Sequence, residues 1–378
     1  MNAVNPPHRD LPTFVTAVER RAAQVVRNAN LPRAQSEVLE NCFGTPGPGE
    51  FIPHLMAPFY FLIRAHGTPV DSRCEALGTA FALVQRGVSL IDKVTDEELS
   101  ETWAELGAAV ALNSGLTLLV LGIDEVWAAE TRNPDVANLR ERLMQHLLCA
   151  SSGQHRELTS RFRVLPTDER IAVSADKASE CSLLIELAGI CSEAAGASPG
   201  RSQLARYRAI GREIGILIQV FNDIADLLGP GSSDDLRTGT WNIPLTTLLN
   251  ALEPAARARW ERTLVRGQGA GKAVIEALYD QGVMASLARR VEQARVLVHE
   301  QSVLLPCGGP YLRLFTSWVD DLTSALLPCR AGEPAGVLTP QDALELSGLS
   351  DGDETIYRAL CACRVGGHAN VSTSSLSS

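Results

Sequence analysis

The sequence has few of the residues that mark β-rich, disulfide-linked or nucleic-acid-binding proteins. Aromatic residues make up 5% of its 378 residues, and short alternating runs of Val, Ile and aromatics are missing, which argues against strands. Its nine cysteines are scattered without CxxC spacing, which favours reduced, mostly buried thiols over a zinc site or a disulfide framework. A net charge of −10 argues against nucleic acid as a partner. We therefore expect an acidic all-α protein.

Signals for export and membrane insertion are also weak. The first residues, MNAVNPPHRDLP, lack a basic region followed by an apolar one, so we expect a cytoplasmic protein without a signal peptide. The run from Leu106 to Ile123 reaches the minimum length of a membrane span. Asn113 and Ser114 interrupt it, however, and Glu105 and Asp124 bound it. We interpret this run as a buried core helix and expect no transmembrane segment.

Apolar residues recur at helical spacing along most of the chain, with Ala, Leu, Glu and Arg prominent in the periodic segments. The pattern predicts helices over residues 14–28, 32–42, 51–65, 72–90, 98–122, 136–152, 168–195, 242–252, 254–265, 271–281, 283–304 and 310–327. Ser72 and Glu75 have the form of a capping box at the start of one of them. We predict a disordered tail at 1–11, one all-α domain at 12–330, a short helical extension at 331–365 and a disordered tail at 366–378.

One stretch, GREIGILIQVFNDIADLLGPGSSDDLRTGTWNIPL, contains polar residues within an apolar run. Asn222 and Asp226 stand four residues apart, so on a helix their oxygens leave the same face, with Asp223 beside them. Burying such groups costs free energy unless something compensates for it. Magnesium takes one or two carboxylates together with waters and phosphate oxygens. The stretch therefore predicts half of a magnesium site for a diphosphate.

A second acidic pair provides the other half. Asp92 and Asp96 are also four residues apart, at the end of an apolar helix. A lone pair of this kind is usually a solvated face or a helix cap, but two pairs on facing helices of a bundle can hold metal ions between them. We predict that Asp92, Asp96, Asn222, Asp223 and Asp226 bind Mg²⁺.

With these motifs, the chain resembles the trans-isoprenyl diphosphate synthases, the polyprenyl synthetase family, which have two aspartate-rich motifs in an all-α bundle with a central cavity. Asp92 to Asp96 resembles the first motif, and Lys177 and Gln154 match a Lys-Thr pair and a Gly-Gln element, with Glu157 where the family usually has Asp. The second motif is similar to Gly215 through Asp226, followed by Gly229, Asp235, Gly239, Pro244 and Leu245.

The resemblance implies site residues beyond the acids. Lys177, Gln154, Gln219, Arg212 and Arg237 are expected to bind the substrate diphosphate. Gly87 and Val88 stand where bulky residues limit chain length in the family, which predicts a deep pocket for a long prenyl chain such as geranylgeranyl. The resemblance also implies a homodimer.

Two departures from the family pattern bear on the reaction. Lys93 and Asn222 each replace an aspartate, and the segment from Gly49 to His54 lacks the basic residues that bind isopentenyl diphosphate in the family. A diphosphate without Arg or Lys partners loses charge-assisted hydrogen bonds of about 1.5–3 kcal/mol each. The sequence therefore favours a terpene synthase that uses one allylic diphosphate. A prenyltransferase, elongating or using another acceptor, and a non-catalytic regulatory subunit remain alternatives.

Overall fold

The structure, a computed structural model, describes residues 10–43, 52–132, 138–192, 201–228, 234–265 and 270–324, and every regular element in these ranges is a helix. The all-α prediction is confirmed. The helices are α1 (Leu11–Asn28), α2 (Arg33–Glu40), α3 (Ile52–Ala65), α4 (Ser72–Thr95), α5 (Glu101–Leu106), α6 (Ala108–Arg132), α7 (Leu139–Thr159), α8 (Thr167–Lys177), α9 (Ser179–Cys191), α10 (Arg201–Leu228), α11 (Asp234–Thr238), α12 (Ile243–Ala251), α13 (Pro254–Val265), α14 (Ala270–Asp280), α15 (Val283–Val303) and α16 (Gly309–Ser324). The extension and tail predicted after residue 330 lie outside the described residues.

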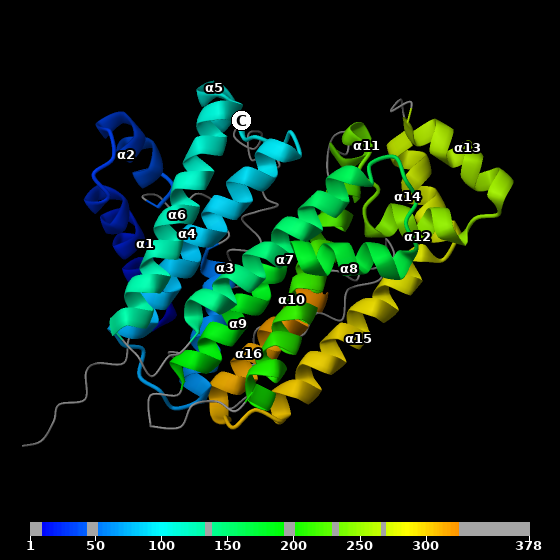
Figure 1. Cartoon of the computed structure of the whole chain (residues 1–378). Coiled ribbons are helices and arrows are strands. Elements are labelled where there is room, and N and C mark those ends of the chain that lie inside the picture. Colours follow the sequence, from blue (N-terminus) through cyan, green and yellow to red (C-terminus); the bar gives the residue numbers. More distant parts are fainter. Residues whose placement is uncertain are drawn as a thin grey trace, which may run out of the picture.

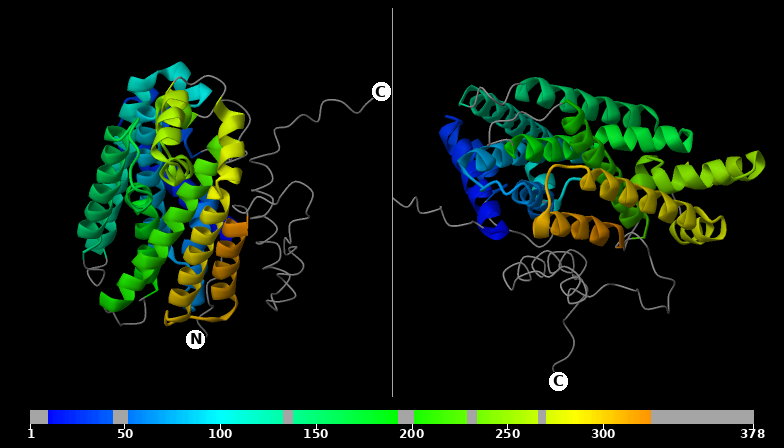
Figure 2. Two further views of the ribbon diagram at one scale, coloured as in Figure 1. Left: turned by 90° about the vertical axis from the view of Figure 1, so that its right-hand side faces the viewer. Right: turned by 90° about the horizontal axis from the view of Figure 1, so that it is seen from below.

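Helix α9 lies at the centre of the bundle. It packs against α3, α4, α7, α8 and α10, and all of its residues from Leu183 to Cys191 are buried. Such a helix is apolar around its whole circumference because it meets protein on every side. Long helices surround it, and α11 to α14 form a group at one end of the bundle (Figures 1 and 2).

Helices α4 and α6 approach each other through glycines. A Cβ added to Gly87 would lie 2.7 Å from the Gly115 carbonyl oxygen and 2.8 Å from the Leu119 nitrogen. A Cβ on Gly122 would lie 2.7 Å from a Val84 side-chain carbon. Real Cβ atoms do not come this close to backbone, so glycine at these places lets the two backbones touch.

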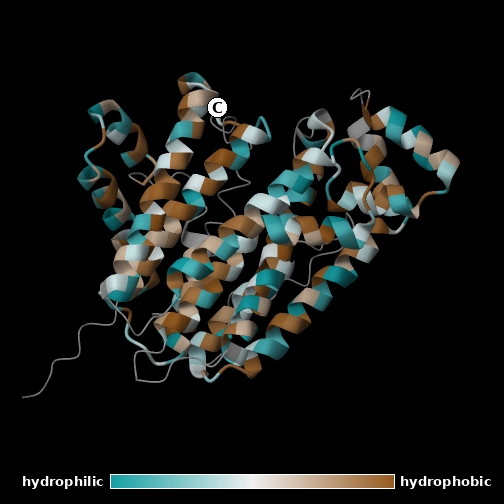
Figure 3. Cartoon of the chain, viewed as in Figure 1, coloured by the Kyte–Doolittle hydropathy of each residue, from teal (hydrophilic) through white to brown (hydrophobic). Residues whose placement is uncertain are grey.

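Helix α6 differs from the sequence prediction because it is not a buried core helix. Only a third of its most apolar part is buried, and it is the one helix in the described part of the chain that is long and apolar enough to cross a membrane. Exposed hydrophobic side chains include Leu112, Leu116, Val120 and Trp127. Hydrophobic residues run along this helix in Figure 3. Its hydropathy alone did not reveal that one side packs on α4 and the other faces outward.

Three local predictions also need correction. The helix expected over 98–122 is two helices, because Gly107 adopts φ 89° between α5 and α6. The helix expected over 168–195 breaks at Ala178. The helix cap assigned to Ser72 belongs to Asp71, whose side chain accepts hydrogen bonds from the backbone N–H groups of Arg73 and Cys74.

Candidate active site

The first acidic pair converges on a lysine. The Lys177 Nζ lies 3.1 Å from Asp92 Oδ1, 3.1 Å from Asp96 Oδ2 and 2.5 Å from Glu157 Oε2. Gln154 donates hydrogen bonds to Thr95 Oγ1 at 2.9 Å and Asp96 Oδ1 at 3.3 Å. Residues far apart in the sequence thus meet at the C-terminal end of α4, and four of the predicted site residues are together.

The backbone places Lys177 next to α7. A Cβ on Gly153 would lie 2.3 Å from the Lys177 nitrogen, so α7 reaches the α8–α9 break only because residue 153 is glycine. Lys177 is the last residue of α8, and the chain turns at Ala178 before α9 begins. This arrangement points the lysine side chain at the acids on α4 and α7.

A buried arginine connects this cluster to the second motif. An Arg170 guanidinium nitrogen donates to Glu157 Oε1, so Glu157 lies between Lys177 and Arg170. Arg170 is 3% exposed and Glu157 is 4% exposed. Arg170 also interacts electrostatically with Asp223 and Asp235, which lie on α10 and α11. A chain of alternating charges therefore joins the two acidic motifs.

The second motif is fixed by backbone and amide contacts. Asp223 Oδ2 accepts a hydrogen bond from the Ile243 N–H at 2.8 Å, and Asp223 is buried. Asn242 caps α12 and donates to Asp235 Oδ2 at 2.7 Å. Asp226 is half-buried within electrostatic range of Asp235, whereas Asn222 is exposed. Asp223 thus has a structural role in addition to any part in binding.

The environment shifts the acidity of several of these groups. Burial raises the pKa of Asp92 to about 6 against the opposing effect of Lys177, and burial raises the pKa of Asp223 to about 6 against that of Arg170. Burial together with Asp223 and Asp226 raises the pKa of Asp235 well above its usual range. Burial alone would raise the pKa of Glu157, but Lys177 and Arg170 outweigh it and lower that pKa. Glu157 therefore stays ionised between its two cations.

The short turn after α7 contacts residues at the ends of both motifs. Arg161 donates to the Thr95 carbonyl oxygen at 3.2 Å and lies 3.6 Å from Asp96 Oδ1. The next residue, Phe162, has φ 58° and donates its backbone N–H to the Gly239 carbonyl oxygen at 2.9 Å. A Cβ on Gly239 would meet the Phe162 ring at 2.2 Å. The turn after α7 therefore bridges from α4 to the segment between α11 and α12.

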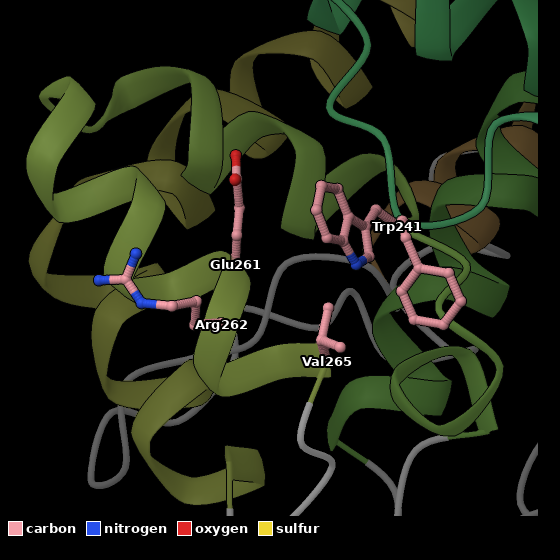
Figure 4. Close-up of a pocket in the computed structure, with 5 residues that line it drawn as sticks. Trp241, Glu261, Arg262 and Val265 are labelled. Atoms are coloured by element: carbon pink, nitrogen blue, oxygen red, sulfur yellow. The ribbon is translucent and has the colours of Figure 1, made fainter.

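An open cavity of about 330 Å³ lies beside this turn. It is lined by Phe162, Trp241, Glu261, Arg262 and Val265. Figure 4 shows the Trp241 indole facing the helix that carries Glu261 and Val265, with Arg262 turned away. Trp241 directly precedes Asn242, which caps α12, but none of the residues that line the cavity belongs to either acidic pair.

Other predicted site residues lie apart from the cluster. Gly87 is at the α4–α6 contact, and Val88 is half-buried against the hydrophobic core. Arg212 lines a different cavity and lies 3.5 Å from Asp176. Gln219 is half-buried on α10. The side chain of Arg237 and those of residues 49–54 lie outside the described residues, so their roles stay predictions.

The sequence interpretation did not identify Arg161 and Arg170 as members of the site, and it named Glu157 only as a departure from a family pattern. One signal was present: Arg170 and Lys177 stand seven residues apart, so they share a helix face with Val173 and Ser174. A cation on the face that also carries buried residues needs a buried partner. This spacing indicates that Arg170 forms a buried ion pair, but it does not identify the acidic partner.

The first acidic pair fits a divalent cation. Asp92 and Asp96 already direct one oxygen each at a single positive atom, Lys177 Nζ. Two nearby oxygens, Gln154 Oε1 and Glu180 Oε2, are buried without a hydrogen-bond partner among the described residues. Among all the residues that the structure describes, no group of three His, Cys, Asp or Glu side chains is arranged to hold a metal by itself. Mg²⁺ bound here would need phosphate oxygens to complete its coordination.

Comparison with solved structures identifies the fold. A decaprenyl diphosphate synthase from Rhodobacter capsulatus superposes with a TM-score of 0.69 at 19% identity, covering 84% of this chain and 97% of the other. The chain has the isoprenyl diphosphate synthase fold. A geranylgeranyl pyrophosphate synthetase from Pyrococcus horikoshii matches this fold with a TM-score of 0.68 at 15% identity, covering 85% and 97% of the two chains.

A polyprenyl synthase from Caulobacter crescentus, complexed with calcium and isoprenyl diphosphate, gives a TM-score of 0.68 at 15% identity, covering 86% of this chain and 99% of that one. No family model and no curated protein matches the sequence. The resemblance to the isoprenyl diphosphate synthases is thus confirmed for the fold, while the identities are too low to transfer an activity.

Proposed function

We propose that the chain is a Mg²⁺-dependent enzyme that ionises an allylic prenyl diphosphate and transfers the prenyl group to an acceptor. The observation that carries the proposal is the Lys177 ammonium held by Asp92, Asp96 and Glu157, with Arg170 continuing the charged cluster to Asp223. These groups gather at one end of an apolar bundle, which suits a substrate with a charged head and a hydrocarbon tail. The fold supports the proposal because its solved examples are named as prenyl diphosphate synthases.

Each side chain has a defined task in this proposal. Asp92 and Asp96 would hold Mg²⁺, which neutralises charge on the leaving diphosphate. Lys177 would move from the carboxylates to the phosphate oxygens, a shift that its flexible side chain allows. Glu157, paired with the buried Arg170, would keep Lys177 charged and oriented. Gln154 would fix the orientation of the Asp96 carboxylate through its hydrogen bond.

Transfer now takes precedence over the cyclisation favoured by the sequence. The argument for a single substrate depends on the missing basic residues at 49–54, whereas the solved structures that match the fold are named as prenyl diphosphate synthases. The pocket for a long prenyl chain was inferred from Gly87 and Val88; Gly87 packs against α6, and Val88 is half-buried. A terpene synthase remains the second candidate, supported by that loss of basic residues in the sequence.

Product analysis would separate the two candidates. The purified chain is incubated with Mg²⁺ and geranyl, farnesyl or geranylgeranyl diphosphate, with and without isopentenyl diphosphate or a neutral aromatic acceptor, and diphosphate release and organic products are measured. Transfer gives product only when an acceptor is added, and cyclisation gives hydrocarbon or alcohol without one. Asp96→Asn should abolish turnover, whereas Asp168→Asn, at an exposed position of α8, should not. Absence of diphosphate release in every mixture refutes the proposal.

We also propose a homodimer formed through the outward face of α6 and α7. Leu112, Leu116 and Val120 recur every four residues on α6, and Met144 and Leu148 are exposed on the adjacent α7. Side chains spaced this way form a continuous apolar stripe, which a second copy with the same stripe can cover symmetrically. Light scattering should give twice the monomer mass of 40.6 kDa. A monomer at micromolar concentration contradicts this assignment.

A further inference from the structure

A second cavity, of about 210 Å³, is lined by residues outside the cluster of Asp92, Asp96, Glu157 and Lys177. Four helices, α7, α8, α9 and α10, contribute to it. Its lining residues are Gln145, His146, Cys149, Ala175, Ser179, Ser182, Arg208 and Arg212. The acidic cluster uses none of them. The cavity therefore needs its own explanation.

Two arginines, Arg208 and Arg212, line the cavity, and each is ion-paired. Arg208 and Arg142 share the fully buried Glu186, and Arg212 and Arg156 share Asp176. Glu169 contacts Arg156, and Glu141 accepts a hydrogen bond from the lining residue Gln145, so the arginines and carboxylates around the cavity balance. Burial alone would raise the pKa of Glu186, but the hydrogen bond from His146 and the arginines lower it, so this glutamate is ionised and already neutralised. The Arg208 and Arg212 side chains are about half exposed. Their free faces can receive an anion.

Hydroxyl and imidazole groups form the floor of the cavity. His146, Ser179 and Ser182 are 6%, 6% and 5% exposed. The ring nitrogens of His146 pair with Ser179 Oγ at 2.9 Å and Glu186 Oε2 at 3.1 Å. The Ser182 hydroxyl lines the cavity and has no hydrogen-bond partner among the described residues. The Ser182 oxygen is not among the fully buried unpaired atoms of the described residues, so it faces the open space of the cavity and can donate to a molecule there.

Both serines of the cavity lie at the start of α9. Ser179 and Ser182 are in the first turn of this helix of thirteen residues, where the Cys181 N–H already donates to the Ala178 carbonyl oxygen at 3.1 Å. Glu180, the acid in the same turn, interacts electrostatically with Asp92 and Lys177 and so belongs to the acidic cluster. The side of the turn that carries the serines therefore presents hydrogen-bond donors without a carboxylate of its own.

We propose that this cavity is a second anion site, which binds a phosphate-type oxyanion between Arg208, Arg212 and Ser182 in the absence of metal. Guanidinium groups at positions i and i+4 of one helix can hold two oxygens of a phosphate, and the serine hydroxyl can donate to a third. The bond to Arg212 would compete with its long contact to Asp176. This site would exist whichever reaction the acidic cluster catalyses.

Calorimetry in EDTA tests the proposal, because without a metal the acidic cluster repels anions. Inorganic diphosphate and inorganic phosphate are titrated separately into the full chain. We expect saturable binding that weakens more than tenfold in the double variant Arg208→Gln/Arg212→Gln. Arg27→Gln is the matched control, since Arg27 is also about half exposed and ion-paired, and it should bind like the wild type.

A second variant keeps the test decisive if the double variant does not fold. Ser182→Val removes the hydroxyl while keeping a similar volume, and it should weaken binding severalfold with an unchanged circular dichroism spectrum. No binding by the wild type, or equal binding by wild type and Ser182→Val, overturns the proposal. Binding that is lost in Lys177→Met but kept in the arginine variant places the anion in the acidic cluster and also overturns it.

Discussion

Replacing Arg170 by methionine tests whether the charged cluster behaves as one unit. Arg170 is 3% exposed, and its partners Glu157 and Asp223 are 4% and 8% exposed. Removing one member of a buried ion pair typically costs about 3–5 kcal/mol, because the remaining charge stays buried without its partner. Glu157 retains Lys177 at 2.5 Å, so we expect a loss of unfolding free energy of about 3 kcal/mol.

A double-mutant cycle separates this coupling from simple loss of packing. Arg170→Met, Glu157→Leu and the double variant are unfolded in urea and followed by circular dichroism. We expect the double variant to be more stable than the sum of the single losses by about 1–3 kcal/mol, since residues in one ionic network couple on this scale. The exposed pair Arg33 and Glu37, with side chains 92% and 60% exposed, serves as the control and should couple by less than about 0.5 kcal/mol. Equal coupling in both cycles would refute the reasoning.

Three further predictions concern other parts of the fold. Gly87→Ala should destabilise the protein by about 1–3 kcal/mol through overpacking, because the added Cβ would lie 2.7 Å from a backbone oxygen. Gly308→Ala is the control: a Cβ added there would have no atom within 4 Å, so the melting temperature should stay nearly unchanged. Burial lowers the pKa of His66 to about 4, so His66 by itself makes the protein less stable as the pH drops from 6.5 to 4, whereas the raised pKa of Asp92 and of Asp223 acts in the opposite direction. His66→Asn should therefore gain stability relative to the wild type as the pH drops through this range, and an unchanged difference between the two proteins would exclude this contribution of His66. Val120→Glu should convert the proposed dimer to a monomer in light scattering without changing the helical content, whereas a dimer that persists would place the interface elsewhere.

The sequence predicted the features that depend on local spacing. Helical periodicity predicted the elements, and the four-residue spacing of Asp92 and Asp96 predicted oxygens on one face, as found at Lys177. The breaks at Gly107 and Ala178 were missed because apolar periodicity continues on both sides of each break. A backbone turn of one residue leaves almost no trace in such a pattern.

Features that depend on distant partners could not be predicted in the same way. Lys177 and Asp96 are 81 residues apart, and the partners of Arg170 are set by how α7, α8 and α10 pack. The hydropathy of α6 was equally ambiguous, because a core helix and a helix with an apolar outer face can have the same composition. Only the position of α6 on the outside of α4 distinguishes them.

The glycine contact between α4 and α6 also restricts how this protein can diversify. A larger residue at Gly87 or Gly115 would push two touching backbones apart. Substitutions on α4 would be tolerated more readily on the neighbouring face, where Val88 is only half-buried. The contact between α4 and α6 therefore restricts substitution on one side of α4 and leaves the side that carries Val88 freer to vary.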